Sequence, residues 1–433
     1  MIETMRPNII LFITHDQGQF LACYNDQTPN SLDTPNLDKI ASDGIRFTNN
    51  FCTAPQCSPS RGSIQTSLYP HQNGLMGLAN RGWNLPGINK TLPIYLKELG
   101  YTTHLVGLQH ETNFPDTLGY DTMTKRTKDY KYHINKIEND FIDFIDSHKT
   151  DEKPFYANFG TIETHRPFRA WADPVDPKSV KVPPFLPDHE MIRQDLAEFY
   201  GTIEKVDNLV GKIIDHLNDT HLLENTLFIY TTDHGSAFPR SKCTLYDPGI
   251  KTLLLMNHQT SELFSGGNKY DQMISNIDLL PTLVELAGGE IPDNIEGKSF
   301  IPLLKENPGQ FRDRIFAEKT YHELYDPIRC IRTSKYKMIY NFEPLDTLYQ
   351  IPQDVLNDLS GKYMKGRYNS PRPMEELYDL EKDPLETRNL AELSEFEHIV
   401  GTLKKELFEW IKNTNDPIFF GRIAKQKSAN FNY

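Results

Sequence analysis

The sequence predicts an α/β fold in two parts: a large domain built on a mainly parallel sheet flanked by helices, and a smaller α+β domain. Up to residue 320, short apolar runs alternate with stretches of helical periodicity, as in parallel strands joined by helices. After that point short β-rich segments and turn-rich sequence follow. The 433 residues also exceed what one hydrophobic core usually serves. We therefore expect two domains, residues 1–320 and 321–433.

The expected elements follow in order along the chain. Four apolar runs have the length of buried strands, residues 8–14, 102–107, 155–160 and 226–232. Apolar residues at helical spacing predict helices near residues 91–99, 134–145, 196–217 and 277–286. In the smaller domain we expect strands at residues 328–332 and 335–341 and a helix near 399–411.

Charge and hydropathy exclude several kinds of partner. Asp and Glu outnumber Lys and Arg by 59 to 46, and no block of five or six consecutive basic residues occurs. We therefore expect neither nucleic acid nor an anionic membrane as a partner. The longest apolar runs are far shorter than the ~20 residues that cross a bilayer, and the N-terminus has no signal-peptide core. A cytoplasmic location is expected, unless a leader has been removed.

The five cysteines, Cys23, Cys52, Cys57, Cys243 and Cys330, are an odd number at scattered spacings with no CxxC pair. Neither a disulfide framework nor a zinc site of paired cysteines is expected. A free thiol is commonly a small buried hydrophobe. Cys57 differs from the others because of the residues around it.

Two pairs of potential ligands follow predicted strands. His15 and Asp16 come after the strand 8–14, and Asp233 and His234 come after the strand 226–232. Open α/β sheets bind ligands at the carboxyl ends of their strands, so the two pairs indicate one metal site. Carboxylates favour calcium or magnesium and imidazoles favour manganese or zinc, which leaves the metal open. Either pair alone also suits a turn and a helix cap.

The most specific motif is Cys57-Ser58-Pro59-Ser60-Arg61-Gly62, followed by Leu68-Tyr69-Pro70-His71. It resembles the C-x-P-x-R signature of the type I sulfatases, in which a formylglycine-generating enzyme recognises the proline and arginine and oxidises the cysteine to formylglycine. The resemblance implies that Cys57 is modified in this way and that Arg61 steadies it. It also implies an alkaline-phosphatase-like fold for the large domain.

The resemblance covers nearly the whole chain. Residues 7–10 with His15-Asp16 look like the family's first strand and metal pair, and residues 231–235 look like its second metal pair. Residues 377–380, 383–384 and 389–390 look like its C-terminal signature. Within the family, residues 182–188 and Phe238-Pro239 are most similar to the heparan N-sulfatases, or sulfamidases.

The resemblance implies hydrolysis of a sulfate ester or an N-sulfate, on a sulfated sugar, with one divalent metal. Calcium is the first expectation, and manganese or magnesium are alternatives. A hydrated aldehyde suits this reaction because one hydroxyl attacks sulfur and the other expels the sulfate. The metal would lower the pKa of the attacking hydroxyl and neutralise the sulfate. Its expected ligands are His15, Asp16, Cys57, Asp233 and His234.

Three further residues take roles from the resemblance. His110, in Gly107-Leu108-Gln109-His110, matches the histidine of the family's G-K-x-H motif, a candidate base for sulfate release. His165, followed by Arg166-Pro167, matches a histidine that contacts the sulfate or the leaving group. Lys242 stands where the family keeps a lysine or arginine on the sulfate, and is a candidate proton donor to the leaving atom.

The chain departs from the family pattern at two positions. The family has Asp-Asp at the first metal pair, where this chain has His15-Asp16. Choline sulfatases and phosphonate monoester hydrolases have Asp-Gln there, so Gln17 is an alternative ligand to His15; we favour His15. The lysine of G-K-x-H is Leu108 here, so either another cation compensates or the substrate differs.

The leading hypothesis is therefore a metal-dependent sulfatase or sulfamidase acting on a small sulfated molecule. One alternative is a phosphonate or phosphate diester hydrolase of the same superfamily, and another is a binding protein that has lost turnover. The formylglycine-generating enzyme is the expected partner in maturation. The identity of the sugar, the linkage and the oligomeric state stay open.

Overall fold

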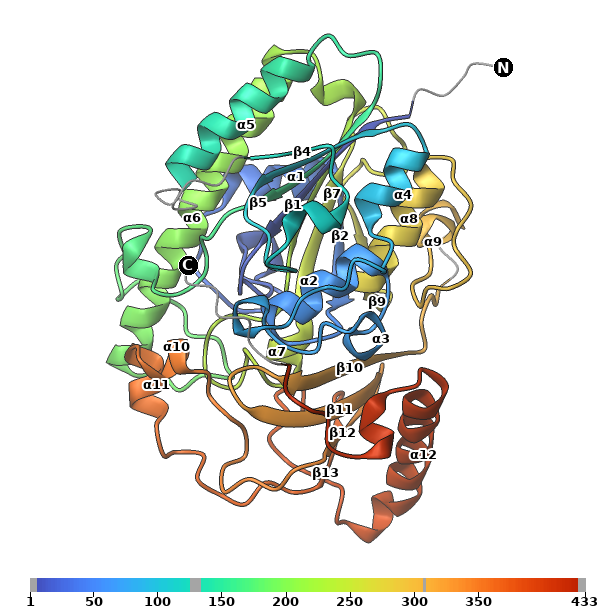
Figure 1. Ribbon diagram of the computed structural model, residues 1–433. Coiled ribbons are helices and arrows are strands. Elements are labelled where there is room, and N and C mark those ends of the chain that lie inside the picture. The colour runs from blue at the N-terminus through green and yellow to red at the C-terminus, as the bar shows by residue number, and fades with distance from the viewer. Residues whose placement is uncertain (1–5, 125–133, 307–308, 427–433) are drawn as a thin grey trace.

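The computed structural model describes residues 6–124, 134–306 and 309–426. Two sheets organise the chain (Figure 1). The large sheet has the strand order β4-β3-β5-β1-β6-β7-β2-β8, with β9 paired to β2, and the small sheet has the order β10-β11-β12-β13. The predicted fold class, a mainly parallel sheet flanked by helices with a separate small antiparallel sheet, is confirmed.

The four strands predicted for the large domain have the predicted bounds, namely β1 (Asn8–Thr14), β3 (Thr102–Gly107), β5 (Phe155–Gly160) and β6 (Thr226–Thr232). At the centre of the sheet β1 pairs in parallel with both β5 and β6. The last residues of β1 and β6, Thr14 and Thr232, lie opposite each other in this pairing. The residues that follow the two strands therefore begin side by side at one edge of the sheet.

Beyond β6 one strand of the described sheet is reversed. The strand β7 (Lys251–Asn257) runs antiparallel to β6 and to β2 (Ile45–Phe51). Short strands β8 (Asn268–Tyr270) and β9 (Ile274–Ser275) pair in parallel with β2, and β4 (Thr122–Met123) pairs in parallel with β3. Because β2 leads into the helix that carries Cys57, this part of the sheet brings that helix to the ends of β1 and β6.

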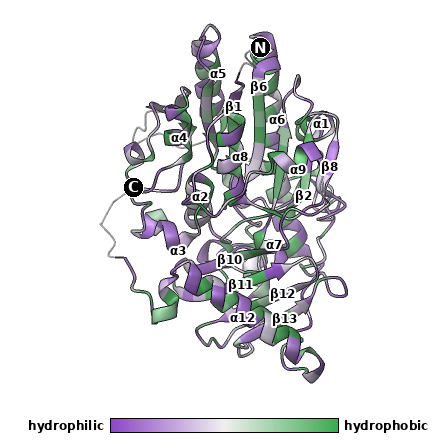
Figure 2. Ribbon diagram, turned by 90° about the vertical axis from the view of Figure 1, so that its right-hand side faces the viewer, coloured by the Kyte–Doolittle hydropathy of each residue, from purple (hydrophilic) through white to green (hydrophobic). Residues whose placement is uncertain are grey.

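Helices cover both faces of the large sheet, and alternate residues of β1 point into two cores. Ile10 and Phe12 pack with α1 (Pro35–Asp43), α5 (Ile134–His148) and α6 (Glu190–Asp219). Ile9, Leu11 and Ile13 pack with α2 (Cys57–Thr66), α4 (Leu92–Glu98) and α8 (Leu279–Leu286). Figure 1 shows α5 and α6 on one side and α4 and α8 on the other, and β6 is largely green in Figure 2. Predicted helix 277–286 is α8 preceded by a 3-10 turn.

The small sheet consists of β10 (Arg314–Tyr321), β11 (Tyr325–Thr333), β12 (Tyr336–Asn341) and β13 (Glu375–Asp379). The helix α12 (Glu397–Asn413), predicted near residues 399–411, packs against this sheet. Between β12 and β13 the chain forms α10 (Gln353–Leu356) and α11 (Leu359–Met364). The division expected at residue 320 falls at the end of β10. Over the described residues, no helix has the length and apolar character to cross a membrane.

Candidate active site

A tight turn after β1 puts His15 and Asp16 into the same site. Neighbouring side chains of a straight strand point to opposite faces, but Asp16 has φ 45° and the chain leaves the strand there. Gly18 has φ +63°, and a Cβ at this position would lie 3.2 Å from Ser236 N. The turn is held by Asp16 N, which donates to Asp233 Oδ1 at 2.9 Å, and by Gly18 N, which donates to the His234 carbonyl at 3.0 Å.

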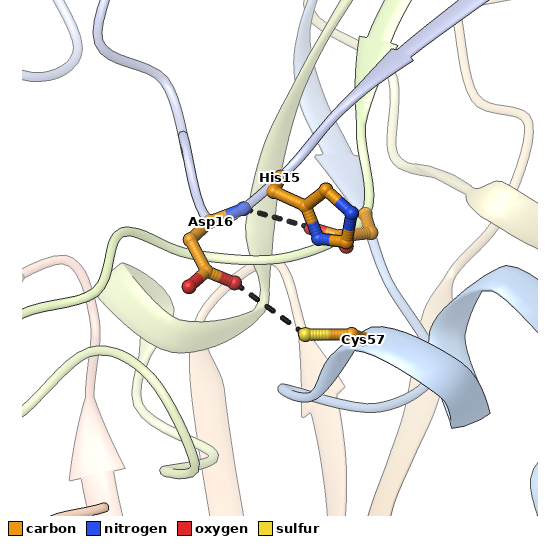
Figure 3. Close-up of side chains that lie close together, drawn as sticks. His15, Asp16 and Cys57 are labelled. Carbon is orange, nitrogen blue, oxygen red and sulfur yellow. Dashed lines mark hydrogen bonds and ion pairs between the residues drawn. The ribbon is translucent and has the colours of Figure 1, made fainter. Parts of the chain in front are cut away.

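Cys57 is the first residue of α2 and faces these two strand ends. Its sulfur lies 3.6 Å from Asp16 Oδ1 and 3.4 Å from His234 Nε2. Figure 3 shows Asp16 reaching from the end of β1 toward the Cys57 sulfur, with the His15 ring beside it. His234 Nε2 also lies 2.9 Å from Asp16 Oδ1. All four side chains are buried, so a ligand held here is shielded from bulk water.

Arg61, one turn along α2, connects the helix to both strand ends. Its Nε donates to Asp233 Oδ2 at 3.0 Å and its Nη2 donates to the Thr14 carbonyl at 3.0 Å. Asp233 Oδ2 also lies 3.1 Å from His15 Nδ1. The buried guanidinium therefore fixes the position of α2 and holds Asp233 as an anion.

Lys242 brings a second buried cation to the other side of Asp16. Its Nζ donates to Asp16 Oδ2 at 2.6 Å and to Asp354 Oδ2 at 2.7 Å, and lies 3.4 Å from His165 Nε2. Asp354, on α10, was not among the residues predicted from the sequence. Its side chain is 23% exposed and that of His165 is 25% exposed, so these two residues stand at the mouth of the site.

His110 adjoins the cluster through His15. The two ring centroids are 6.1 Å apart, and the His15 ring lies 5.7 Å from that of His165. The structure thus places three imidazoles next to one another. Around them lies one network of contacts, formed by Asp16, Cys57, Arg61, Asp233, His234 and Lys242. Every candidate site residue from the sequence lies in or beside this network.

Burial and the dense charge shift the titration of these groups. Burial, with Asp16 nearby, raises the pKa of the Cys57 thiol well above its usual value, so the unmodified thiol is neutral and a poor nucleophile. Burial, with Arg61 nearby, lowers the pKa of His15 to about 4. Burial, with His15 nearby, also lowers the pKa of His110 well below its usual value. Both imidazoles are therefore neutral near pH 7 and can accept a proton or bind a cation.

Neighbouring carboxylates raise the pKa of two basic groups, Lys242 and His234. Burial alone would lower the pKa of Lys242, but the carboxylates of Asp16 and Asp354 raise it well above the usual value. Burial likewise opposes protonation of His234, yet Asp233 and Asp16 raise its pKa. His234 Nδ1 faces the Gly235 carbonyl at 2.9 Å, and a carbonyl only accepts, which assigns the proton to Nδ1. Nε2 is then the nitrogen that faces Asp16 and Cys57.

Residues 7–289 match the family model described as Sulfatase. The chain belongs to the sulfatase family. A second model, described as N-sulphoglucosamine sulphohydrolase, C-terminal, matches residues 237–370 of this sulfatase. An ulvan-active sulfatase of Formosa agariphila is 31% identical over 429 residues, which cover 95% of this chain and 81% of the relative.

Two further comparisons agree with this assignment. The human N-sulphoglucosamine sulphohydrolase is 28% identical to this sulfatase over 466 residues, covering 95% of this chain and 91% of the human protein. The structure of a putative sulfatase yidJ from Bacteroides fragilis superposes with a TM-score of 0.76 at 21% identity, over 97% of this chain and 98% of the other. The second likeness concerns the fold alone.

Gln17 points away from the site of the sulfatase. Its Oε1 accepts hydrogen bonds from Thr14 Oγ1 at 2.7 Å and Tyr230 OH at 2.8 Å, and its Nε2 donates to the Phe20 carbonyl at 3.1 Å. The side-chain amide therefore already has partners inside the core behind β1. Leu108, the position of the family lysine, is also buried.

The residues at the strand ends of the sulfatase suit a divalent cation. His15, Asp16, Cys57 and Asp233 each bring one possible ligand atom within 4.8 Å of the others. Nε2 of His15 is buried and has no hydrogen-bond partner among the described residues, while Nδ1 lies 3.1 Å from Asp233 Oδ2. Buried polar atoms are almost always satisfied, and two carboxylates beside an imidazole nitrogen without a partner are a donor set that such a cation fits.

Proposed function

We propose that this sulfatase hydrolyses a sulfate ester or an N-sulfate on a small sulfated sugar, with formylglycine derived from Cys57 as the nucleophile. The observation that carries the proposal is the position of Cys57. Its sulfur lies between the ends of β1 and β6, within 3.6 Å of Asp16 and His234. The names of two relatives, an ulvan-active sulfatase and an N-sulphoglucosamine sulphohydrolase, support a sulfated sugar as the substrate.

The proposal includes one divalent cation, with calcium as the first expectation and manganese or magnesium as alternatives. His15, Asp16, Asp233 and His234 would hold it, together with the formylglycine derived from Cys57. When bound, such a cation neutralises sulfate oxygens and makes a nearby hydroxyl more acidic. The buried Nε2 of His15, which has no partner among the described residues, supports the inclusion of His15 among the ligands.

The other side chains bind the sulfate and move protons. Lys242, an ammonium beside Asp16, is placed to pair with a sulfate oxygen and to donate a proton to the leaving oxygen or nitrogen. His165 is partly exposed at the mouth and is placed to contact the sulfate or the leaving group. His110, neutral because its pKa is lowered by burial, is the candidate base that accepts a proton when sulfate is released. The N-terminus of α2 adds backbone N–H groups that favour an anion.

A phosphonate or phosphate diester hydrolase is the second candidate, because enzymes of that kind share the superfamily. Its support is the pair Asp16-Gln17, which would match the Asp-Gln metal pair of those enzymes if Gln17, and not His15, were the ligand. The hydrogen bonds of the Gln17 amide to Thr14, Tyr230 and Phe20 weigh against Gln17 as the ligand. We therefore favour sulfate over phosphonate.

The test is a comparison of substrates. The protein would be produced together with a formylglycine-generating enzyme and assayed on an aryl sulfate, N-sulfoglucosamine and an aryl phosphonate. We expect kcat/KM for at least one sulfated substrate to exceed that for the phosphonate. Faster turnover of the phosphonate than of either sulfated compound would favour the second candidate instead.

A further inference from the structure

One segment of the small domain reaches over the candidate active site. Between β12 and β13 the chain leaves the small sheet, and its helices α10 and α11 lie against the large domain (Figure 1). The helix α11 packs on α6. The segment therefore forms a wall of the site that comes from a distant part of the sequence.

Arg166 anchors this segment next to His165. Its guanidinium pairs with Asp195 of α6 at 2.8 and 2.7 Å and with Asp358 of the segment at 2.9 Å, and also donates to Ser360 Oγ at 3.2 Å. Arg166 and Asp195 are buried. Because His165 precedes Arg166 in the chain, these contacts fix α10 relative to the imidazole at the mouth of the site.

Asp354 is the residue that this arrangement presents to the site. Its Oδ2 is held by Lys242 Nζ at 2.7 Å and lies 3.8 Å from His165 Nε2. Its Oδ1 is buried and has no hydrogen-bond partner among the described residues. A buried carboxylate oxygen needs a donor, and because Asp354 shares Lys242 with Asp16, this oxygen belongs to the same site.

A cavity lies next to the site, and chain neighbours of Asp354 and Lys242 are part of its lining. It has a volume of about 300 Å³ and is lined by Cys243, which follows Lys242, by Gln353, which precedes Asp354, and by His322, Tyr349, Gln350 and Asn369. This volume is at the lower end of the range for ligand pockets. Leu324, Leu356 and Met364 also line it, so the cavity offers apolar contacts as well as polar groups.

We propose that Asp354 determines which leaving groups the enzyme accepts, by accepting a hydrogen bond from an N–H or O–H donor beside the bond that is cleaved. The inference rests on the proposed function. An ionised carboxylate can only accept hydrogen bonds. It therefore favours the N–H of a sulfamate, or a sugar hydroxyl next to a sulfate ester, over an aryl sulfate that offers no donor.

The experiment measures kcat/KM of wild type and Asp354→Asn on four substrates: an aryl sulfate, the matching N-aryl sulfamate, N-sulfoglucosamine and a sugar O-sulfate. We expect kcat/KM for a donor-bearing substrate, divided by that for the aryl sulfate, to fall about ten- to a hundredfold, as for one lost hydrogen bond to a charged group. A fall with the aryl sulfamate identifies the N–H as the donor, and a fall confined to the sugars identifies a hydroxyl.

A partly unfolded sample lowers turnover of all substrates together and leaves the ratios unchanged. A disturbed Lys242 slows substrates with poor leaving groups most, so recognition of a hydroxyl is measured against the same sugar O-sulfate with the neighbouring hydroxyl methylated, whose leaving group matches. Asp346→Asn is the matched control, since Asp346 is exposed on the same segment, and its ratios should equal those of wild type. Unchanged ratios in Asp354→Asn, with an active wild type, would overturn this inference alone. A wild type that releases sulfate from none of the four compounds would overturn the proposed function and this inference with it.

Discussion

The two buried carboxylates of the candidate site, Asp16 and Asp233, have different partners. Asp16 faces Lys242 and His234 and lies near the Cys57 sulfur. Asp233 faces Arg61 and His15 and accepts hydrogen bonds from two backbone N–H groups, those of Asp16 and His234. Each carboxylate therefore has a permanent cation on one side and an imidazole on the other. This leaves the space between them for a further positive charge.

The different partners predict different effects of two substitutions on metal content. Asp233→Ala should lose the bound metal and the activity, because it removes a ligand and leaves Arg61 without its partner. Lys242→Ala should lose activity but keep the metal, because the lysine contacts Asp16 only from the substrate side. Elemental analysis of both purified variants after dialysis checks this. Equal loss of metal in the two would overturn the division of roles.

His15 and Gln17 provide a second test at the level of single residues. His15→Ala should lose metal, whereas Gln17→Ala should keep it and lose stability, by about 1–3 kcal/mol for the buried partners left unsatisfied. Metal content and thermal unfolding of the two variants would be measured together. Full metal content in His15→Ala with loss in Gln17→Ala would show that Gln17 is the ligand.

The residues of the site differ in how far sequence could predict them. His15, Asp16, Asp233 and His234 follow apolar strands directly, and Cys57 and Arg61 belong to a specific motif, so local patterns point to them. Asp354 lies in turn-rich sequence at the start of a short helix. An aspartate at a helix start is commonly a capping residue, so its position in the sequence does not indicate a site. Only the packing of α11 on α6 and the contacts of Arg166 bring it to the site, and these are tertiary contacts.

At the level of elements, the connection from β6 to α7 (Asp247–Ile250) controls where His234 lies. Gly235 follows His234, and a Cβ at this position would lie 2.0 Å from the Pro248 carbonyl oxygen. Two segments of backbone meet there, so no flexible side chain can move aside. The close approach of these segments depends on the absence of a side chain.

Gly235→Ala should therefore destabilise the protein and reduce its metal content, because the connection must shift and His234 with it. Gly401→Ala is the matched control: Gly401 lies in α12, with nothing within 4 Å of a Cβ. There the substitution should stabilise by about 1 kcal/mol, the usual helix preference for alanine over glycine. Thermal unfolding and elemental analysis measure both. Unchanged stability and metal in Gly235→Ala would contradict the proposed constraint.

Some strands that sequence reasoning missed, such as β2, have a weak pattern, whereas β7 was missed although its pattern is strong. β2 contains Arg46, Thr48, Asn49 and Asn50 among its apolar residues, and the register with β7 shifts between Phe47 and Asn50. β7 is a good apolar run, but nothing local indicates that it runs antiparallel to β6. Its direction is set by its antiparallel pairing with β6 and β2, which is a long-range property.

At the scale of the whole molecule, the two sheets share one hydrophobic core. Ile331, Met338 and Leu377 of the small sheet belong to the same buried cluster as Ile9 and Leu11 of β1. Buried ion pairs also cross between the two parts, since Asp247 pairs with Lys337 at 2.6 Å and with Arg332 at 2.9 Å. The two domains therefore do not have separate interiors.

This shared core predicts that the domains unfold together. Scanning calorimetry should show a single transition whose calorimetric and van't Hoff enthalpies agree, because neither part can open without exposing the core of the other. Two resolved transitions, one of them leaving the large domain folded, would contradict this account of the interface.

We propose that Cys57, oxidised to formylglycine, cleaves a sulfate bond at the ends of β1 and β6. The most direct measurement is sulfate release by wild type and Cys57→Ala, both produced with a formylglycine-generating enzyme, alongside the mass of the peptide that contains residue 57. We expect the formylglycine mass in wild type, and turnover in the alanine variant lower by more than about a thousandfold, as for loss of an essential nucleophile. An active wild type with an unmodified thiol, or an alanine variant that retains more than this activity, would contradict the claim.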